Sequence, residues 1–154
     1  MEGTEIYNLV KERFAGAVLG FSAELDPCIE VEPANISQLA ALMKAEPQLA
    51  FDSLMCLSGV DYGERLGVVY HLFSTMHRHK IALKLLINKD DPRLASVESV
   101  WRAAAWFERE AFDLYGLIFV GHPDLRRILL PDDWEGHPLR KDYVYPESYH
   151  GVPI

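Results

Sequence analysis

The densest group of residues able to do chemistry is the run Trp106–Gly116, which reads WFEREAFDLYG. If this run is helical, Arg109 and Asp113 stand four residues apart and can form an ion pair on one exposed edge. Glu110 and Asp113 are also neighbours, at a spacing where two carboxylates could share acid–base work. We favour a simpler interpretation, because charge pairs on helices are usually surface electrostatics. In it the run is a solvated or interface face that interrupts a core stripe formed by Trp101, Ala105, Phe112 and Tyr115.

The histidines form the second candidate group. His77 and His79 lie in a basic stretch, and His122 and His137 each precede a proline. Several histidines could form a metal site, but these lack an HxxxH or HExxH arrangement. The stretch 77–80 is more simply the tip of a basic turn, so we predict no metal site.

Motifs for cofactor or nucleophile chemistry are absent from the sequence. It contains no GxSxG, GxGxxG or GxxxxGK[ST] motif, so nucleophile-elbow, dinucleotide and P-loop chemistry have no support. Cys28 and Cys56 are far apart and fall in predicted strands, where a cysteine is usually a small buried hydrophobic residue. We therefore predict no catalytic, cofactor-binding or metal-binding residue in this chain.

The composition excludes several classes of protein. The chain has 154 residues, of which 49% are hydrophobic, and its net charge is −8. This apolar fraction is higher than that of disordered chains, so the protein is not disordered. A non-specific nucleic-acid binder needs a net positive charge, so the negative charge excludes that class. There is no apolar run of about 18 residues for a membrane-spanning helix, and the acidic start of the chain shows no signal peptide. We expect a soluble, cytoplasmic single domain of α/β type.

Apolar spacing and turn residues predict the elements that position these groups. The first half contains a helix over residues 6–21, a strand over 28–32 and a helix from Ile36 to before Pro47 with Asn35 as its N-cap. A strand over 54–57, closed by a turn over 58–61, comes next. A hairpin of strands 66–73 and 81–87 around a polar turn follows, and then a helix from about 96 to 115 capped by Gly116. This order favours an α+β fold, a two-layer sandwich of a mixed sheet and helices.

The last fifth of the chain differs from the rest. Residues 121–154 hold five of the nine prolines and show neither a helical nor a strand period. We therefore divide the chain into an α+β body, residues 1–120, and an extended irregular C-terminal arm, residues 121–154. The arm is rich in Trp, Tyr and Arg, the residue types that anchor protein interfaces. We expect it to wrap a partner protein; the alternative is an arm folded back over its own sheet.

Two runs in the second half of the chain resemble a known family. They are residues 106–116 and the longer run 121–143, GHPDLRRILLPDDWEGHPLRKDY. In these runs the chain is similar to the thirty-kilodalton-subunit family of proton-pumping NADH:quinone oxidoreductase, respiratory complex I. A looser likeness extends back through Phe51–Tyr62 and Tyr70–Leu72, and one departure is Val144-Tyr145-Pro146, where the family often places proline directly after the tyrosine. Because the chain ends soon after this signature, we expect a free-standing subunit.

The resemblance implies a structural, non-catalytic subunit of a hetero-oligomer. Its C-terminal segment would wrap the large quinone-site subunit of the peripheral arm, beside neighbouring iron–sulfur subunits, and brace the quinone-reducing module. The complex would transfer electrons from NADH to quinone and translocate protons, with FMN, iron–sulfur clusters and quinone held by partner subunits and no cofactor here. The subunit would lie peripherally on the cytoplasmic face of the inner or plasma membrane. By family analogy the partner-contacting residues are Glu108, Arg109, Glu110, Asp113, His122, Asp124, Arg126, Arg127, Trp134, His137, Arg140, Lys141 and Asp142.

Two alternatives are open from the sequence. The chain could be the equivalent subunit of a membrane-bound [NiFe] hydrogenase or an F420-type dehydrogenase complex, because only the electron-input partners separate these complexes. It could instead be a stand-alone metal-dependent enzyme that uses His122, His137 and Glu110.

Overall fold

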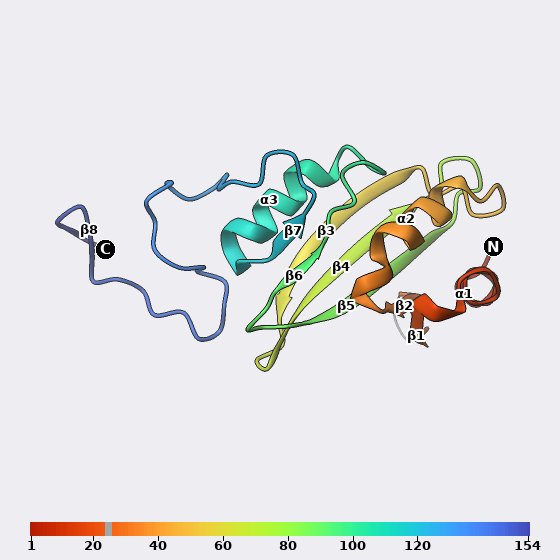
Figure 1. Ribbon diagram of the computed structural model, residues 1–154, viewed down its shortest axis with the longest axis horizontal. Coiled ribbons are helices and arrows are strands. Elements are labelled where there is room, and N and C mark those ends of the chain that lie inside the picture. Colours follow the sequence, from red (N-terminus) through yellow and green to blue (C-terminus); the bar gives the residue numbers. More distant parts are fainter. Residues whose placement is uncertain (24–25) are drawn as a thin grey trace.

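A mixed five-stranded sheet forms the centre of the molecule. The computed structural model describes residues 1–23 and 26–154, and the strand order in the sheet is β1-β2-β5-β4-β3 (Figure 1). The strands are β1 (Val18–Ser22), β2 (Cys28–Val31), β3 (Ser53–Asp61), β4 (Arg65–Phe73) and β5 (Lys80–Asn88). β2 runs parallel to β5 and the other neighbours are antiparallel. The predicted α+β sandwich of a mixed sheet and helices is confirmed.

The rest of the described chain forms helices and short strands. The helices are α1 (Gly3–Arg13), α2 (Ile36–Ala45) and α3 (Ala104–Tyr115), with short 3-10 turns η1 (Ala15–Ala17) and η2 (Pro33–Asn35). β6 (Arg93–Ala95) and β7 (Ile118–Val120) form a parallel pair, and β8 (Ser148–Tyr149) and β9 (Val152–Pro153) form an antiparallel pair near the C-terminus. In the described part of the chain, no helix has both the length and the apolar character needed to cross a membrane.

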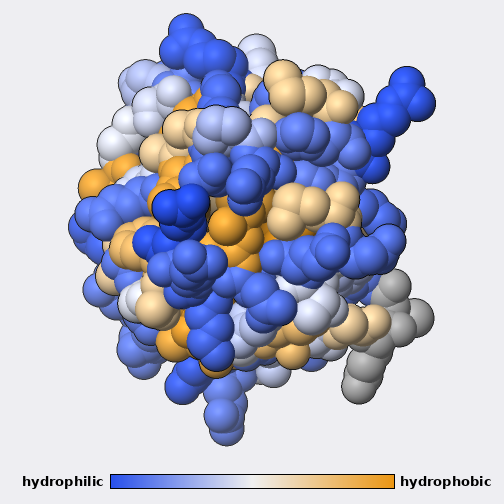
Figure 2. Space-filling view, turned by 90° about the vertical axis from the view of Figure 1, so that its right-hand side faces the viewer, coloured by the Kyte–Doolittle hydropathy of each residue, from blue (hydrophilic) through white to orange (hydrophobic). Residues whose placement is uncertain are grey.

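The core lies between the sheet and the helices. Alternate residues of β4 and β5 are buried on the same face, as the two-residue period of a strand requires. α2 places an apolar stripe against that face, formed by Ile36, Leu39, Ala40 and Met43. Figure 2 shows the end of the molecule that carries α1, where hydrophobic residues form small areas among hydrophilic ones.

The predicted first helix is wrong beyond Arg13. The chain leaves the helix at Phe14 (φ −148°) and turns through η1 into β1, which pairs with β2. Apolar residues that continue a helical spacing by chance also fit a turn followed by a strand, so spacing alone could not find this boundary. The second helix starts where predicted, but the Asn35 side chain donates to the Gly16 carbonyl oxygen at 2.9 Å and does not cap the helix.

Two other boundaries also differ from the prediction. The third helix begins at Ala104, because residues 98–100 and 102–103 form turns. The turn predicted over residues 58–61 is the end of β3, which pairs with β4 as far as Asp61. The hairpin turn and the cap at Gly116 (φ +72°) are confirmed, although His79, in that turn, is buried.

The chain beyond Val120 follows an irregular course. It passes beside α3 and ends at the opposite side of the molecule from the N-terminus (Figure 1). Its only regular element in the described residues is the β8–β9 pair. The division at residue 120 and the contact with a partner stay predictions, but the arm's contacts with α3 are defined.

Candidate interface: the arm docked on helix α3

The carboxylate of Asp113 holds the arm against α3. The side chain is fully buried, and its Oδ2 accepts the backbone N–H groups of Ile128, Leu129 and Leu130 at 3.1, 2.7 and 2.9 Å. Its Oδ1 accepts Nη1 of Arg127 at 2.7 Å. Burial opposes ionisation, but these donors outweigh it and hold the pKa of Asp113 below its ordinary value. One carboxylate therefore fixes four consecutive residues of the arm.

Two arginines extend this attachment through backbone carbonyl groups. Arg127 also donates Nη2 to the carbonyl oxygens of Trp134 at 2.8 Å and Gly136 at 3.0 Å. Arg109 donates Nε to the Arg126 oxygen at 3.2 Å and Nη2 to the Arg127 oxygen at 2.9 Å. Arg109 is buried, so the exposed Arg109–Asp113 pair that helical spacing allowed is not formed. Each residue instead binds the arm.

The arm also completes the C-terminal end of α3. The last carbonyl groups of a helix have no partner within it, and cations are favoured there. Here three consecutive carbonyl oxygens accept hydrogen bonds from the arm: Asp113 O from Nδ1 of His137 at 2.9 Å, Leu114 O from the Leu139 N–H at 3.1 Å, and Tyr115 O from Nε of Arg140 at 2.6 Å. The helix end and the arm thus satisfy each other's polar groups.

Gly116 makes this close approach possible. A Cβ atom at this position would lie 2.6 Å from the ring of His137 and 2.8 Å from Nη2 of Arg140. Burial is the main cause that lowers the pKa of His137, with the positive charges of Arg140 and Arg127 acting in the same direction. Its hydrogen bond to the Asp113 carbonyl opposes the shift without cancelling it, so the surroundings favour the neutral imidazole.

A second attachment joins the arm to the end of β3. The buried Asp61 accepts the Lys141 backbone N–H at 2.8 Å and Nζ of Lys89 at 3.1 Å on Oδ2, and the Gly63 N–H at 2.7 Å on Oδ1. Lys89 also pairs with Asp142 at 3.0 Å. Burial would raise the pKa of Asp61, but the N–H groups and the Lys89 ammonium lower it to about 2.

The start of the arm and the loop before α3 are fixed by Glu108 and His122. The buried Glu108 accepts Oγ of Ser96 at 2.6 Å and the Val97 N–H at 2.8 Å, and burial raises its pKa. His122 donates Nε2–H to the Ala105 oxygen at 3.0 Å and accepts the Asp124 N–H on Nδ1 at 3.0 Å. Both side chains position backbone.

The distal arm has its own small polar cluster. Trp134 donates Nε1–H to the Tyr143 hydroxyl at 3.0 Å. Asp133 binds the Tyr149 hydroxyl and Nε2 of His150, each at 2.7 Å. These contacts hold the β8–β9 pair against the preceding residues.

When the arm lies on α3, the outer surface of the arm and of α3 stays exposed. Glu110, Asp124 and Arg126 are exposed, and Arg126 forms an exposed ion pair with Asp124 at 2.9 Å. Large hydrophobic side chains are exposed on α3, β7 and the arm: Trp106, Val120, Leu129, Leu139, Val144, Tyr145, Val152 and Ile154. The outer surface of α3 and the arm thus combines apolar side chains with charged ones, the composition of a protein interface.

Candidate metal and acid–base groups are not brought together. Among residues 1–23 and 26–154, no three His, Cys, Asp or Glu side chains form a group that could hold a metal ion. Glu110 is exposed whereas Asp113 is buried and saturated with donors, so the two do not form a carboxylate pair. Each candidate residue instead has a positioning contact or faces solvent.

Sequence reasoning missed Asp61 and Lys89, which the structure places in the second attachment. A signal was present, since Asp61-Tyr62-Gly63 ends a strand with an aspartate able to bind the N–H two residues on, as Asp61 does. The pairing with the Lys141 backbone, 80 residues away, had no signal in spacing.

The chain is similar to proteins of one family along most of its length. Residues 29–149 match a family model described as "Respiratory-chain NADH dehydrogenase, 30 Kd subunit". The chain is 49% identical over 152 residues to a subunit of NADH-quinone oxidoreductase from Chloroherpeton thalassium, covering 96% of this chain and 63% of that protein. It is 46% identical over 153 residues to the protein of the same name from Chlorobium phaeobacteroides, covering 96% of this chain and 92% of the relative.

Two solved structures have a fold similar to that of this chain. A trypsin-resistant fragment (1-134) of Nqo5 superposes with a TM-score of 0.68 at 26% identity, over 81% of this chain and all of the fragment. A chain of the membrane-bound sulfane sulfur reductase, an archaeal respiratory membrane complex, gives a TM-score of 0.76 at 24% identity over 92% of this chain and 85% of its own. The second likeness concerns the fold alone.

Proposed function

This chain belongs to the 30-kDa-subunit family of respiratory-chain NADH dehydrogenases, and from that premise we propose that it is a structural subunit of an NADH-quinone oxidoreductase. In this proposal it braces the quinone-reducing module of the peripheral arm and takes no direct part in electron or proton transfer. The complex would carry electrons from NADH to quinone and translocate protons.

The observation that carries the proposal is the arm docked through buried polar groups with several of its large apolar side chains exposed. A segment that folds to bury its own apolar residues would place Leu129 and Val144 inside, yet they are 62% and 85% exposed. The donors on Asp113 fix the backbone of residues 127–130, so little conformational entropy is left to lose when a partner binds. This arrangement suits a preformed interface.

The proposed partner for this surface is the large quinone-site subunit, with iron–sulfur subunits beside it. Exposed charges such as Glu110, Asp124 and Arg126 would form the polar rim of the interface, and Trp106 would be an aromatic anchor. The buried members of the predicted contact set, among them Arg109 and Asp113, would act by positioning the arm. FMN, iron–sulfur clusters and quinone would be held by other subunits, and attachment to the cytoplasmic face of the membrane would be through these partners.

The interface can be tested by placing charge on the outer surface of the arm. In the tagged chain expressed in its source organism, Leu129→Arg with Val144→Arg should reduce the co-purified large subunit by about tenfold or more, because a charge buried without a partner is costly. Met76→Arg is the matched control, since Met76 is 74% exposed in the β4–β5 turn, away from the arm. Wild-type recovery of the large subunit with the double variant would remove this surface from the interface.

Subunit identification and metal analysis separate the remaining alternatives. Mass spectrometry of the purified complex should find a flavoprotein that oxidises NADH; hydrogenase or F420-oxidising subunits in its place would assign the chain to a related complex. Stoichiometric zinc or iron bound to the isolated chain at His122, His137 and Glu110 would favour a metal-dependent enzyme.

A further inference from the structure

One histidine of the arm lies between two arginines at the C-terminal end of α3. His137 donates Nδ1–H to the Asp113 carbonyl oxygen at 2.9 Å, and Nη1 of Arg127 donates to the same oxygen at 3.2 Å. On the other side, the Cδ2–Nε2 edge of the His137 ring and Nη2 of Arg140 lie 2.6 and 2.8 Å from the point that a Cβ atom on Gly116 would occupy. The imidazole ring is therefore held between two guanidinium groups.

The hydrogen bond to Asp113 determines where a further proton would bind. Because a carbonyl oxygen only accepts, Nδ1 of His137 carries the hydrogen and Nε2 is the unprotonated ring nitrogen. Nε2 lies over the Cα of Gly116 and on the same side as the Arg140 guanidinium, and neither group can accept a hydrogen bond. A proton on Nε2 would thus add a third positive charge to this end of the helix and gain no acceptor from these neighbours.

The groups of opposite charge near His137 already have partners. The carboxylate of Asp113 accepts three backbone N–H groups and the Arg127 guanidinium. The carbonyl oxygens at the end of a helix favour a cation, but Arg127 and Arg140 already donate to those of Asp113 and Tyr115. Burial, followed by the charges of Arg140 and Arg127, lowers the pKa of His137 from its ordinary value of 6.5, and Asp113 only partly opposes this shift.

We infer that His137 is a pH-sensitive contact of the arm, which docks on α3 while the imidazole is neutral and docks more weakly when Nε2 takes up a proton. An undocked His137 has solvent around it and no adjacent guanidinium groups, so it binds the proton more tightly, and protonation favours the undocked arm. Docking is therefore at full strength above pH 6.5 and weakens as the pH falls below that value. The inference deepens the proposed function, on which its bearing on assembly rests, because it gives the proposed interface a dependence on pH.

Amide hydrogen exchange of the full chain at two pH values tests this contact. Protection factors, which compare each amide with an unfolded peptide at the same pH, remove the direct effect of pH on exchange. Those of residues 128–130, whose N–H groups bind Asp113, should fall between about pH 7.5 and about pH 5.5. The share due to His137 is at most about tenfold, because pH 5.5 is about one unit below its ordinary pKa of 6.5.

The variant His137→Asn keeps the hydrogen-bond donor and removes the titration. The asparagine Nδ2 can replace Nδ1 as the donor to the Asp113 oxygen, and an amide takes up no proton in this pH range. Its protection factors should fall several-fold less in acid than those of wild type, and equal falls would overturn the inference. An NMR titration of the His137 ring gives a check that needs no docking of this variant. The pKa should be below 6.5 in wild type and rise towards 6.5 in Asp113→Ala, which loses the arm's acceptor; a wild-type pKa of 6.5 or more would also overturn the inference.

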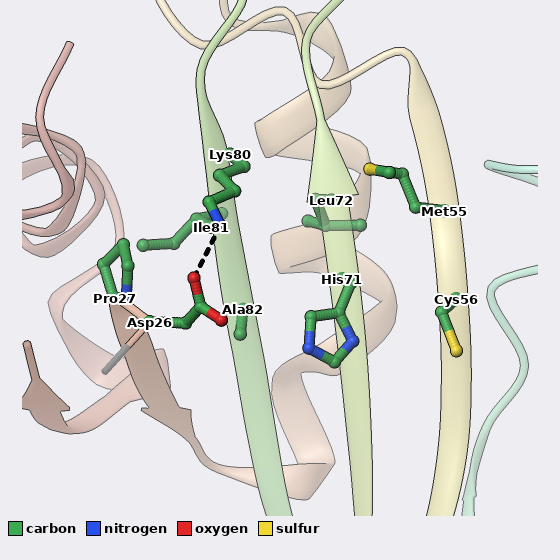
Figure 3. Close-up of a pocket in the computed structure, with 9 residues that line it drawn as sticks. All are labelled: Asp26, Pro27, Met55, Cys56, His71, Leu72, Lys80, Ile81 and Ala82. Atoms are coloured by element: carbon green, nitrogen blue, oxygen red, sulfur yellow. Dashed lines mark hydrogen bonds and ion pairs between the residues drawn. The ribbon is translucent and has the colours of Figure 1, made fainter. Parts of the chain in front are cut away.

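His71 supplies the matched control. It is an exposed histidine of β4 on the face of the sheet turned away from α2, with Ala82 and Cys56 beside it (Figure 3). His71→Asn makes the same replacement outside the contacts of the arm, so residues 128–130 should lose protection in acid as they do in wild type. If His71→Asn reduces that loss as much as His137→Asn does, the pH effect does not come from the His137 contact and the inference fails.

Co-purification at the same two pH values separates this inference from the proposed function. The tagged wild-type chain should recover less of the large subunit at the lower pH, and His137→Asn should lose less of it. If exchange shows the His137-dependent weakening but Leu129→Arg with Val144→Arg recovers the large subunit as wild type does, the pH-sensitive contact stands and the proposed interface fails. If exchange is the same in wild type and His137→Asn while the double variant loses the large subunit, the pH-sensitive contact fails and the proposed function stands.

Discussion

Helices α2 and α3 both cover elements of the body, yet they are held by different chemistry. α2 buries Ile36, Leu39 and Met43, an apolar stripe at helical spacing. α3 buries Glu108, Arg109 and Asp113 together with two alanines. Buried charges are stable only when paired and hydrogen-bonded, and in α3 their partners are the backbone of loops and of the arm.

This difference separates two tasks. An apolar stripe holds a helix against a sheet, but its contacts have no preferred direction. They cannot fix a segment whose apolar residues follow neither helical nor strand spacing. Carboxylate and guanidinium groups on α3 supply directional hydrogen bonds, so they can hold an irregular chain in one conformation. If this comparison is right, substitutions of the buried polar residues of α3 should release the arm. Substitutions of the buried apolar residues of α2 should instead destabilise the body.

The sharpest test is Asp113→Ala. It removes the acceptor of three backbone N–H groups and leaves the Arg127 guanidinium without its carboxylate. The free energy of arm docking should fall by about 3 to 5 kcal/mol. Hydrogen exchange of the amides of residues 128–130 should lose its protection, with strand amides unaffected. Glu110→Ala, at an exposed position of the same helix, is the control.

Leu39→Ala tests the other helix. Leu39 is fully buried in α2, so its truncation should lower the free energy of unfolding of the body by about 2 to 5 kcal/mol. Urea denaturation followed by far-ultraviolet circular dichroism measures this change. Gln38→Ala, on the exposed side of α2, should change stability by no more than about 0.5 kcal/mol. Local release of the arm without loss of body stability would break the comparison.

Acid should weaken the attachment at Asp61. Its pKa in the folded protein is about 2, below the ordinary value of 3.8. A depressed pKa means that the ionised form stabilises the fold above pH 3.8, and that this contribution disappears as the pH falls through about 2. Wild-type protein should therefore lose about 2 kcal/mol more than Asp61→Asn between about pH 5 and about pH 2. Parallel pH curves in urea denaturation for the two proteins would refute this role of Asp61.

The smallest effect is expected at Arg126. Its ion pair with Asp124 is exposed, so Arg126→Ala should change arm docking by less than about 1 kcal/mol. Arg127→Ala, next to it, removes the buried pair with Asp113 and should release the arm. Amide exchange of residues 128–130 distinguishes the two variants. If the amides of residues 128–130 stayed as protected in Arg127→Ala as in Arg126→Ala, the arm would not depend on the buried pair.

Periodicity predicted the elements that apolar packing determines. Alternation in β4 and β5 and the stripe of α2 repeat the geometry of the sheet and the helix, so their positions could be read from spacing. The spacing from Phe14 to Phe21 continued a helical pattern where the chain forms a turn and β1, because β1 is determined by pairing with a strand further along the chain. The residues of β1 alone do not show that this segment pairs with β2.

Residue types predicted that the arm contacts a partner, whereas the individual contact residues were named only by resemblance. The run from Glu108 to Asp113 looked like a charged surface, since the spacing of charges does not show whether a distant backbone supplies partners. Glu108 and Asp113 accept hydrogen bonds from backbone N–H groups of irregular segments. Only the three-dimensional structure shows these contacts. The family resemblance, carried by the same residues, identified the run without explaining it.

The way Asp113 holds the arm affects how the two regions respond to cooling. The body is stabilised by apolar burial, which gives a large heat capacity change and weakens as temperature falls. Arm docking relies mainly on charge-assisted hydrogen bonds, and it leaves Leu129, Leu139 and Val144 in solvent. Its heat capacity change is therefore small, and the arm should keep its place at low temperatures where the contacts within the body have already weakened.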